Sequence, residues 1–225
     1  MRPGHGRQRP LDRWMYLGDQ EVASVLACSA ARVEMAMSGS DRAKANRDEF
    51  LIRLALASGL RVSELVGLRV GCLVRVGDEN LVAIELGAKN HLRRTIFIDA
   101  ALMTDLEAWL AGYPKAMPIF RSTGNRAMTV RRAQQLWVEI AAQAGLPWRP
   151  RFHALRHTHA VQYLRAGGTL VSLQARLGHR SLAETTRYLH ASADDSRTGA
   201  EALGALLVRL RQAAMTVTVV AGDAA

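Results

Sequence analysis

The sequence predicts an α+β protein that is mainly helical and contains one small three-stranded antiparallel sheet. Apolar residues recur at helical spacing along most of the 225 residues. The pattern changes at three short β-branched runs, residues 69–76, 81–86 and 92–98, which are separated by the turn-rich segments GDEN (77–80) and GAKNH (87–91). Short β-branched runs between turns are typical of an antiparallel meander.

The remaining elements are expected to be helices. Their predicted ranges are 19–37, 41–58, 61–67, 99–112, 129–145, 153–166, 169–177, 181–190 and 200–214. The expected N-caps are Asp41, Asp99, Thr129, Thr169 and Ser181, residue types whose side-chain oxygen can accept from the first free backbone N–H groups. Gly59 is expected to end the second helix, since glycine adopts the left-handed conformation that follows many helices.

The composition indicates a soluble, basic, intracellular protein. Thirty Lys and Arg against twenty Asp and Glu leave a net charge of +10, and 49% of the residues are hydrophobic, enough for a buried core and too many for a disordered chain. No apolar run approaches the roughly 18 residues that span a membrane, and the start MRPGHGRQRP has no apolar secretion signal. Cys28 and Cys72 are too few for a disulfide framework and are expected to be free thiols.

The charge favours a polyanionic partner, because neutralising phosphates releases condensed counterions. Lys44, Lys89 and Lys115 are the sole lysines, so arginine carries nearly all the positive charge. Arginine's planar fork suits bidentate contact with phosphate. Aromatic residues make up 5% of the chain, which argues against single-strand binding by base stacking.

Residues suited to phosphate chemistry occur at helix ends, on one helix face and at a strand turn. His153 and Arg156 are three residues apart, so they share a helix face. His179 follows a glycine at a predicted helix end, and Tyr188 comes nine residues later. The set is completed by Arg61, at the start of a short helix, and by Lys89, at the turn between two strands.

Such a set could cleave a phosphodiester without a metal. Two guanidiniums and an imidazole would stabilise the negative charge of a pentavalent transition state. A tyrosine with a pKa of about 10 is a poor nucleophile unless cations or a base assist it. We predict that His153 acts as the base and that Lys89 protonates the departing sugar oxygen. The product would be a covalent protein–DNA phosphotyrosine.

Three segments closely resemble the tyrosine recombinase (phage integrase-like) family: 58–68 (SGLRVSELVGL), 153–160 (HALRHTHA) and 177–190 (LGHRSLAETTRYLH). The resemblance runs over about residues 19–195. It implies the family's catalytic fold and DNA strand exchange through a 3′-phosphotyrosine, with no metal or nucleotide cofactor. It also implies the roles of the six residues: Tyr188 as nucleophile, Arg61 and Arg156 as phosphate ligands with His179, His153 as base and Lys89 as the hairpin lysine.

The sequence departs from the family pattern in two places. The hairpin turn reads GAKNH, where the family commonly has Gly-Lys-Gly. Members of the family usually have a separate helical DNA-binding domain before the catalytic one, for which these 225 residues leave no room, so a short form is expected, as in the fimbrial-switch invertases. We predict a basic flexible arm (1–18), a catalytic domain (19–198) and a C-terminal helix and tail (199–225), which would either pack on a neighbouring protomer or close its own core. The chain would then be a minimal recombinase or a catalytic fragment that needs a partner DNA-binding domain.

The expected partner is double-stranded DNA, bound by a dimer on each site and a tetramer in synapsis, with accessory proteins as a further option. The expected setting is the cytoplasm and nucleoid of a bacterium, on a mobile element or plasmid. The alternative is a non-catalytic DNA-binding regulator, since residues 169–189 also fit a helix-turn-helix, although that leaves the arginines and Tyr188 unexplained. A topoisomerase-like swivelase is a second alternative. Zinc is not expected, because His153, His157 and His159 lack a clear further ligand.

Overall fold

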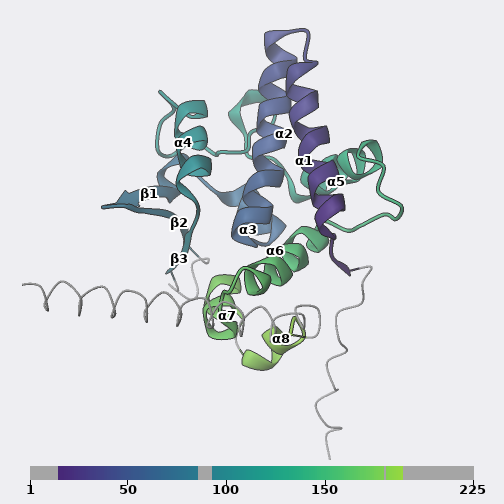
Figure 1. The fold of residues 1–225 in the computed structure, drawn as a ribbon. Helices are drawn as coiled ribbons and strands as arrows, with labels where there is room; N and C mark the ends of the chain where they lie inside the picture. The colour runs from purple at the N-terminus through teal and green to yellow at the C-terminus, as the bar shows by residue number, and fades with distance from the viewer. Residues whose placement is uncertain (1–14, 86–92, 180, 190–225) are drawn as a thin grey trace, which may run out of the picture.

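The computed structural model describes residues 15–85, 93–179 and 181–189 and has the predicted helical architecture with one small sheet (Figure 1). The elements are α1 (Asp19–Glu34), α2 (Gly39–Ser58), α3 (Val62–Gly67), η2 (Val70–Cys72), β1 (Leu73–Val76), β2 (Glu79–Glu85), β3 (Arg93–Phe97), α4 (Ala100–Trp109), η3 (Thr123–Asn125), α5 (Val130–Gln143), α6 (His153–Arg165), α7 (Leu170–Leu177) and α8 (Leu182–Thr186). Lys89 and the predicted helix at 200–214 lie outside the described residues.

Helices α1 and α2 lie side by side, and α6 crosses below the end of α2, with α7 and α8 beneath it (Figure 1). The N-cap of α2 is Ser38, one turn earlier than the predicted Asp41: the Ser38 hydroxyl accepts from the Asp41 backbone N–H at 3.0 Å. The prediction for Asp99, Thr129 and Thr169 is confirmed, since each side chain accepts a backbone N–H in the first turn of its helix.

The sheet has the predicted antiparallel order β1-β2-β3. Its first strand begins at Leu73 and not at residue 69, because the N–H groups of Val70 and Gly71 donate to Met117 and Lys115 (2.9 and 2.8 Å) instead of to a strand. The turn between β1 and β2 is also shorter than GDEN, since Glu79 and Asn80 already pair with β1.

Two apolar clusters form the core of the described residues. The larger one joins α1 to α5, the sheet and the start of α6. The smaller one lies between α6, α7 and α8 and is built from Tyr16, Ala160, Val161, Leu164, Leu173, Leu177 and Tyr188. Helix α8 ends at Thr186 and not at residue 190, so Tyr188 lies in the turn that follows the helix. No helix in the described part of the chain is long and apolar enough to cross a membrane.

Candidate active site

Arg61 lies at the point where α2 gives way to α3. Gly59 ends α2 in the left-handed conformation (φ 65°), and Arg61 then occupies the N-cap of α3. Its backbone N–H donates to the Glu64 carboxylate at 2.7 Å, and its Nη1 lies 3.3 Å from the same carboxylate. The side chain is 42% exposed, so it can reach a ligand at the surface.

Arg156 is buried at the centre of the site. Its Nη1 donates to the Gly59 carbonyl and its Nη2 to the Leu177 carbonyl, both at 2.8 Å. These carbonyls belong to the turn before Arg61 and to the end of α7, so one side chain joins three segments that are far apart in sequence. Burial, followed by the charge of Arg61, lowers the pKa of Arg156 to about 10, so the group is still charged at neutral pH.

His179 follows Gly178, which ends α7 in the left-handed conformation (φ 66°). The His179 Nδ1 is hydrogen-bonded to the buried Thr185 hydroxyl (3.0 Å). Burial, followed by the charges of Arg156 and Arg61, lowers the pKa of His179 to about 4, so the ring is neutral at physiological pH.

Tyr188 is buried, and its phenol oxygen is hydrogen-bonded to Nδ1 of His157 at 2.9 Å. Its ring also lies nearly parallel to that of His179, at 6.4 Å between centroids. Burial raises the pKa of Tyr188, while the nearby Arg156 opposes this rise. Burial and the neighbouring His153 lower the pKa of His157 to about 3, so the phenol meets a neutral imidazole.

His153, the predicted base, begins α6 and is exposed, with its ring 4.4 Å from that of His157 in an edge-on arrangement. Although its surface is open to solvent, His153 is partly desolvated by its neighbours, and this partial burial, followed by the charges of Arg156 and Arg61, lowers its pKa. The site thus contains Arg61, His153, Arg156, His179 and Tyr188 of the predicted set. The sequence indicated at most a supporting role for His157, for which its i,i+4 spacing from His153 was the available signal. Nothing in the sequence singled out Arg94, whose Nη2 also donates to the Glu64 carboxylate.

A comparison with known protein families agrees with the arrangement of arginines, histidines and tyrosine in the site. Residues 28–195 match the model of the phage integrase family. The chain belongs to the phage integrase family. The family prediction from the three motifs is confirmed.

Named relatives of this integrase-family chain are tyrosine recombinases. XerC of Pseudomonas aeruginosa strain LESB58 is 37% identical over 150 residues, which cover 65% of this chain and 48% of XerC. XerC 1 of Ralstonia nicotianae is 31% identical over 186 residues, covering 75% and 56%. The chain spans about half the length of the curated relatives it matches.

Solved structures share the integrase fold. XerH recombinase, in a post-cleavage complex with a palindromic difH substrate, matches with a TM-score of 0.68 and 22% identity, over 84% of this chain and 53% of XerH. The catalytic domain of bacteriophage HP1 integrase matches with a TM-score of 0.57 and 19% identity, over 83% and 93%. The predicted fold class is therefore confirmed.

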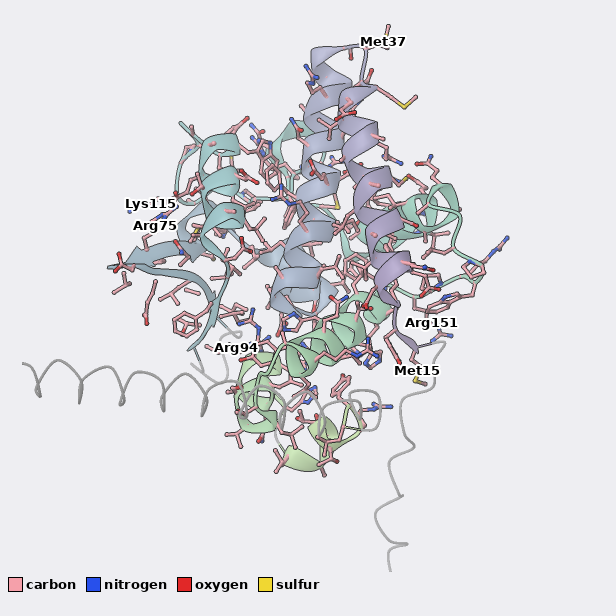
Figure 2. The ribbon with its side chains drawn as sticks, in the orientation of Figure 1. Met15, Met37, Arg75, Arg94, Lys115 and Arg151 are labelled. Carbon is pink, nitrogen blue, oxygen red and sulfur yellow. The ribbon has the colours of Figure 1, made fainter. Side chains whose placement is uncertain are left out.

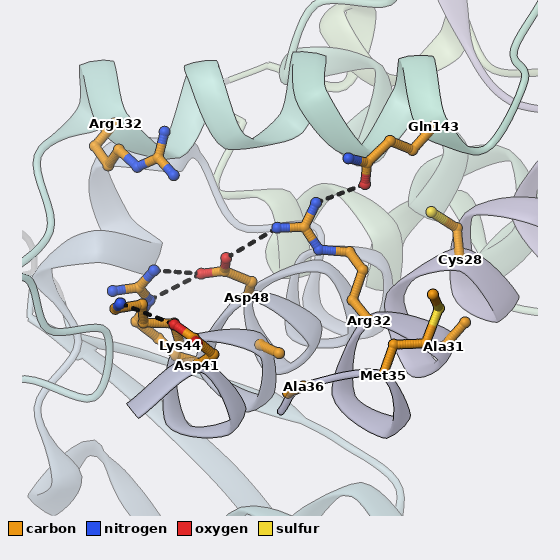
Figure 3. A pocket seen from close by; sticks show the side chains of 12 residues that line it. Cys28, Ala31, Arg32, Met35, Ala36, Asp41, Lys44, Asp48, Arg132 and Gln143 are labelled. Carbon is orange, nitrogen blue, oxygen red and sulfur yellow. Dashed lines mark hydrogen bonds and ion pairs between the residues drawn. The ribbon is translucent and has the colours of Figure 1, made fainter. Parts of the chain in front are cut away.

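A pocket of about 700 Å³ between α1, α2 and α5 contains none of the predicted site residues (Figure 3). Its centre is Asp48, which is buried and bonded to Arg47 Nε and Nη2 at 2.8 and 2.6 Å, while Arg32 bonds Gln143 at 2.6 Å. The charged side chains that line the pocket largely pair with one another, and these interactions between helices help to hold the three helices together. Among the described residues, no group of three or more His, Cys, Asp or Glu side chains could hold a metal ion.

Proposed function

We propose that this protein is a site-specific DNA recombinase that cuts and rejoins double-stranded DNA through a covalent 3′-phosphotyrosine at Tyr188. The observation that carries the proposal is the convergence of two arginines and three histidines on one tyrosine, from segments between residues 61 and 188. Membership of the integrase family and the recombinase names of its relatives support it.

Arg61 and Arg156 would bind the non-bridging oxygens of the scissile phosphate, with His179 beside them. The two cations need no proton to be charged, and they would stabilise the negative charge that grows on the pentavalent phosphorus. The Tyr188 oxygen then forms a bond to phosphorus while the bond to the 5′ oxygen of the DNA breaks. The departing oxygen takes a proton, for which we propose Lys89 as donor.

The proton of Tyr188 must leave as the new bond forms. His157 is poorly suited to take it, because burial lowers the pKa of His157 to about 3 and raises the pKa of Tyr188, so a proton transfer from the phenol to this imidazole is strongly unfavourable. We assign His157 to orienting the phenol and His153 to removing the proton. A bound phosphate would raise the pKa of His153, because its negative charge offsets the arginines that lower it.

Two further arginines extend the basic surface from the site. A pocket of about 550 Å³ beside His153 and His157 is also lined by the exposed side chains of Arg149 and Arg151. We propose that these two contact DNA phosphates next to the scissile one. Such contacts fix the register of the duplex without reading its sequence.

The assembly follows from the chemistry, because exchanging strands requires two duplexes. We propose a dimer on each site and a tetramer in synapsis, and lambda integrase structures provide the precedent: a dimer bound to a COC′ core site and a tetramer bound to a Holliday junction. We propose a bacterial mobile element or plasmid as the setting, in the cytoplasm, with residues 19–198 as the catalytic domain and residues 199–225 contacting a neighbouring protomer.

Covalent trapping tests the proposal. Nicked duplexes from the DNA that flanks the gene would be incubated with the protein, denatured and examined for a protein band shifted by attached DNA. On a nicked substrate the short cleaved fragment diffuses away, so rejoining fails and the covalent complex accumulates. Wild-type protein should give the shifted band, and sequencing the attached DNA identifies the site.

Tyr188→Phe should give no shifted band while binding DNA with nearly unchanged affinity, because it lacks a single hydroxyl. Tyr163→Phe is the matched control: it also removes a hydrogen-bonded phenol hydroxyl, here 3.1 Å from Ser172, and should still form the band. Cleavage by Tyr188→Phe would exclude Tyr188 as the nucleophile. DNA binding by the wild-type protein without any band would favour a regulator or a catalytic fragment that needs a partner.

A further inference from the structure

The buried carboxylate of Glu64 is shared unequally by two arginines. Arg94, on β3, donates from Nη2 to Glu64 at 2.9 Å, whereas Nη1 of Arg61 lies 3.3 Å from the other carboxylate oxygen. The side chain of Arg94 is 11% exposed and that of Arg61 is 42% exposed. Glu64 therefore makes its stronger ion pair with Arg94, which extends from the sheet toward α6 and α7 (Figure 2).

The charge balance of the site depends on this arrangement. If Arg61 and Glu64 were alone, they would form a closed pair with no net charge. Arg94 supplies a second positive charge and pairs with the carboxylate. The positive charge of Arg61 is then not neutralised by Glu64 and can attract an incoming anion. A buried carboxylate attracts the nearest guanidinium strongly, because little water screens it.

We propose that Arg94 is a positioning residue of the strand-transfer site: it pairs with Glu64 and thereby leaves Arg61 free to bind the scissile phosphate. This inference rests on the proposed function and adds a residue that does not itself touch the DNA. If Glu64 is removed, Arg94 has no carboxylate to pair with and no positioning role. If Arg94 is removed, Glu64 pairs with Arg61 alone and holds it away from the phosphate.

The packing around Arg94 supports a role in charge balance. Among the described residues, its buried Nε and Nη1 atoms have no hydrogen-bond acceptor, an unfavourable arrangement that stability alone does not explain. Nη1 also lies against Gly178, where an added Cβ atom would come within 2.3 Å of it. The same side chain thus contacts the turn that carries His179 and the carboxylate that contacts Arg61.

The test measures the single-turnover rate of covalent complex formation, on the nicked duplex that the wild-type protein cleaves. Arg94→Gln should lower this rate about tenfold to a hundredfold, less than the ~10²–10³ that loss of a whole anion-stabilising donor costs. The double variant Glu64→Gln with Arg94→Gln should recover most of the loss, because an amide does not hold Arg61 by charge. The matched control is Arg75→Gln, which removes the same charge from β1, where Arg75 pairs with Glu107 at 2.8 Å, and should leave the rate unchanged.

A methylphosphonate at the scissile position separates this role from a folding defect. It has no negative charge, so Arg61 contributes less and the loss caused by Arg94→Gln should shrink to about twofold. An equal loss on both substrates, or a double variant no faster than Arg94→Gln, would overturn the inference. If the wild-type protein forms the covalent complex and Arg94→Gln forms it equally fast, the inference is overturned while the proposed function stays intact. If the wild-type protein forms no covalent complex, both the inference about Arg94 and the proposed function are overturned.

Discussion

At the scale of single residues, Arg156 does two jobs with one guanidinium. Its two hydrogen bonds go to the carbonyls of Gly59 and Leu177, which lie at the C-terminal ends of α2 and α7. Carbonyls at a helix end have no partner within the helix and carry partial negative charge, so a cation there is favourable. Arg156 thus fixes the geometry of the site while contributing the charge that a phosphate would meet.

Arg156→Lys should therefore damage both properties. A single ammonium group cannot span two carbonyls that a planar guanidinium bridges, so one buried carbonyl loses its partner, at a cost of about 1–3 kcal/mol in the free energy of unfolding. We expect covalent complex formation to fall by ~10²–10³. Urea unfolding and the trapping assay measure the two effects. Arg75→Lys, at an exposed position on β1 where Arg75 pairs with Glu107, is the control, and a near-wild-type rate for Arg156→Lys would contradict a phosphate-binding role.

Residue types and spacing located Arg61, His153, Arg156, His179 and Tyr188, because each lies within a short motif. They did not predict the partner of the Tyr188 hydroxyl. The hydrogen bond to His157 joins residues 31 positions apart, and the Arg94–Glu64 ion pair joins residues 30 apart. Contacts over such separations depend on how the helices and the sheet pack, which a local pattern does not contain.

At the scale of elements, the turn between α7 and α8 determines where His179 lies. Gly178 leaves α7 with φ 66°, and the next residue turns back so that its backbone N–H donates to the Gln174 carbonyl (3.2 Å). Two constraints meet at Gly178: the left-handed backbone and the close approach of Arg94. The glycine in the sequence predicted the end of the helix, but the sequence did not predict that Arg94 of β3 contacts Gly178.

Gly178→Ala and Gly145→Ala separate these two constraints. Both glycines have positive φ, 66° and 71°, but an added Cβ at Gly145 meets no atom within 4 Å. Gly145→Ala should lose about 1–2 kcal/mol of stability from backbone strain alone. Gly178→Ala should lose more and should also slow covalent complex formation, because it displaces Arg94. Equal losses of stability with unchanged cleavage would show that the contact with Arg94 is unimportant.

At the scale of the whole molecule, Tyr188, the proposed nucleophile, is part of the smaller apolar core and not of a surface loop. The ring of Tyr188 packs with residues of α6 and α7, and α6 also supplies the partners His157 and Arg156. The sequence predicted α6 and the residues on it. It placed Tyr188 within a helix of 181–190, whereas α8 stops at Thr186 so that the chain can turn and bury the ring.

Two histidines of α6 make this core sensitive to acid. His159 bonds the Leu56 carbonyl through Nδ1 (2.7 Å), and its Nε2 accepts from Nε of Arg176 (2.9 Å). A carbonyl cannot donate, so Nδ1 carries the proton and the ring is neutral. Burial is the main cause that lowers the pKa of His159, as of His157, to about 3. Protonating either ring places a cation beside arginine in a buried site.

The whole fold should therefore lose stability between pH 7 and pH 5. In the unfolded chain these histidines titrate near pH 6.5, so on acidification the unfolded state binds protons that the folded state does not. Each of these two histidines should then contribute a loss of about 2 kcal/mol over this range, and His179, whose pKa is also lowered to about 4, should add a similar loss. Urea unfolding at pH 5, 6 and 7 measures the loss. His157→Asn, whose amide does not titrate, should reduce the difference between pH 7 and pH 5 by about 2 kcal/mol. A stability that is flat with pH in the wild type would show that these rings accept protons without cost.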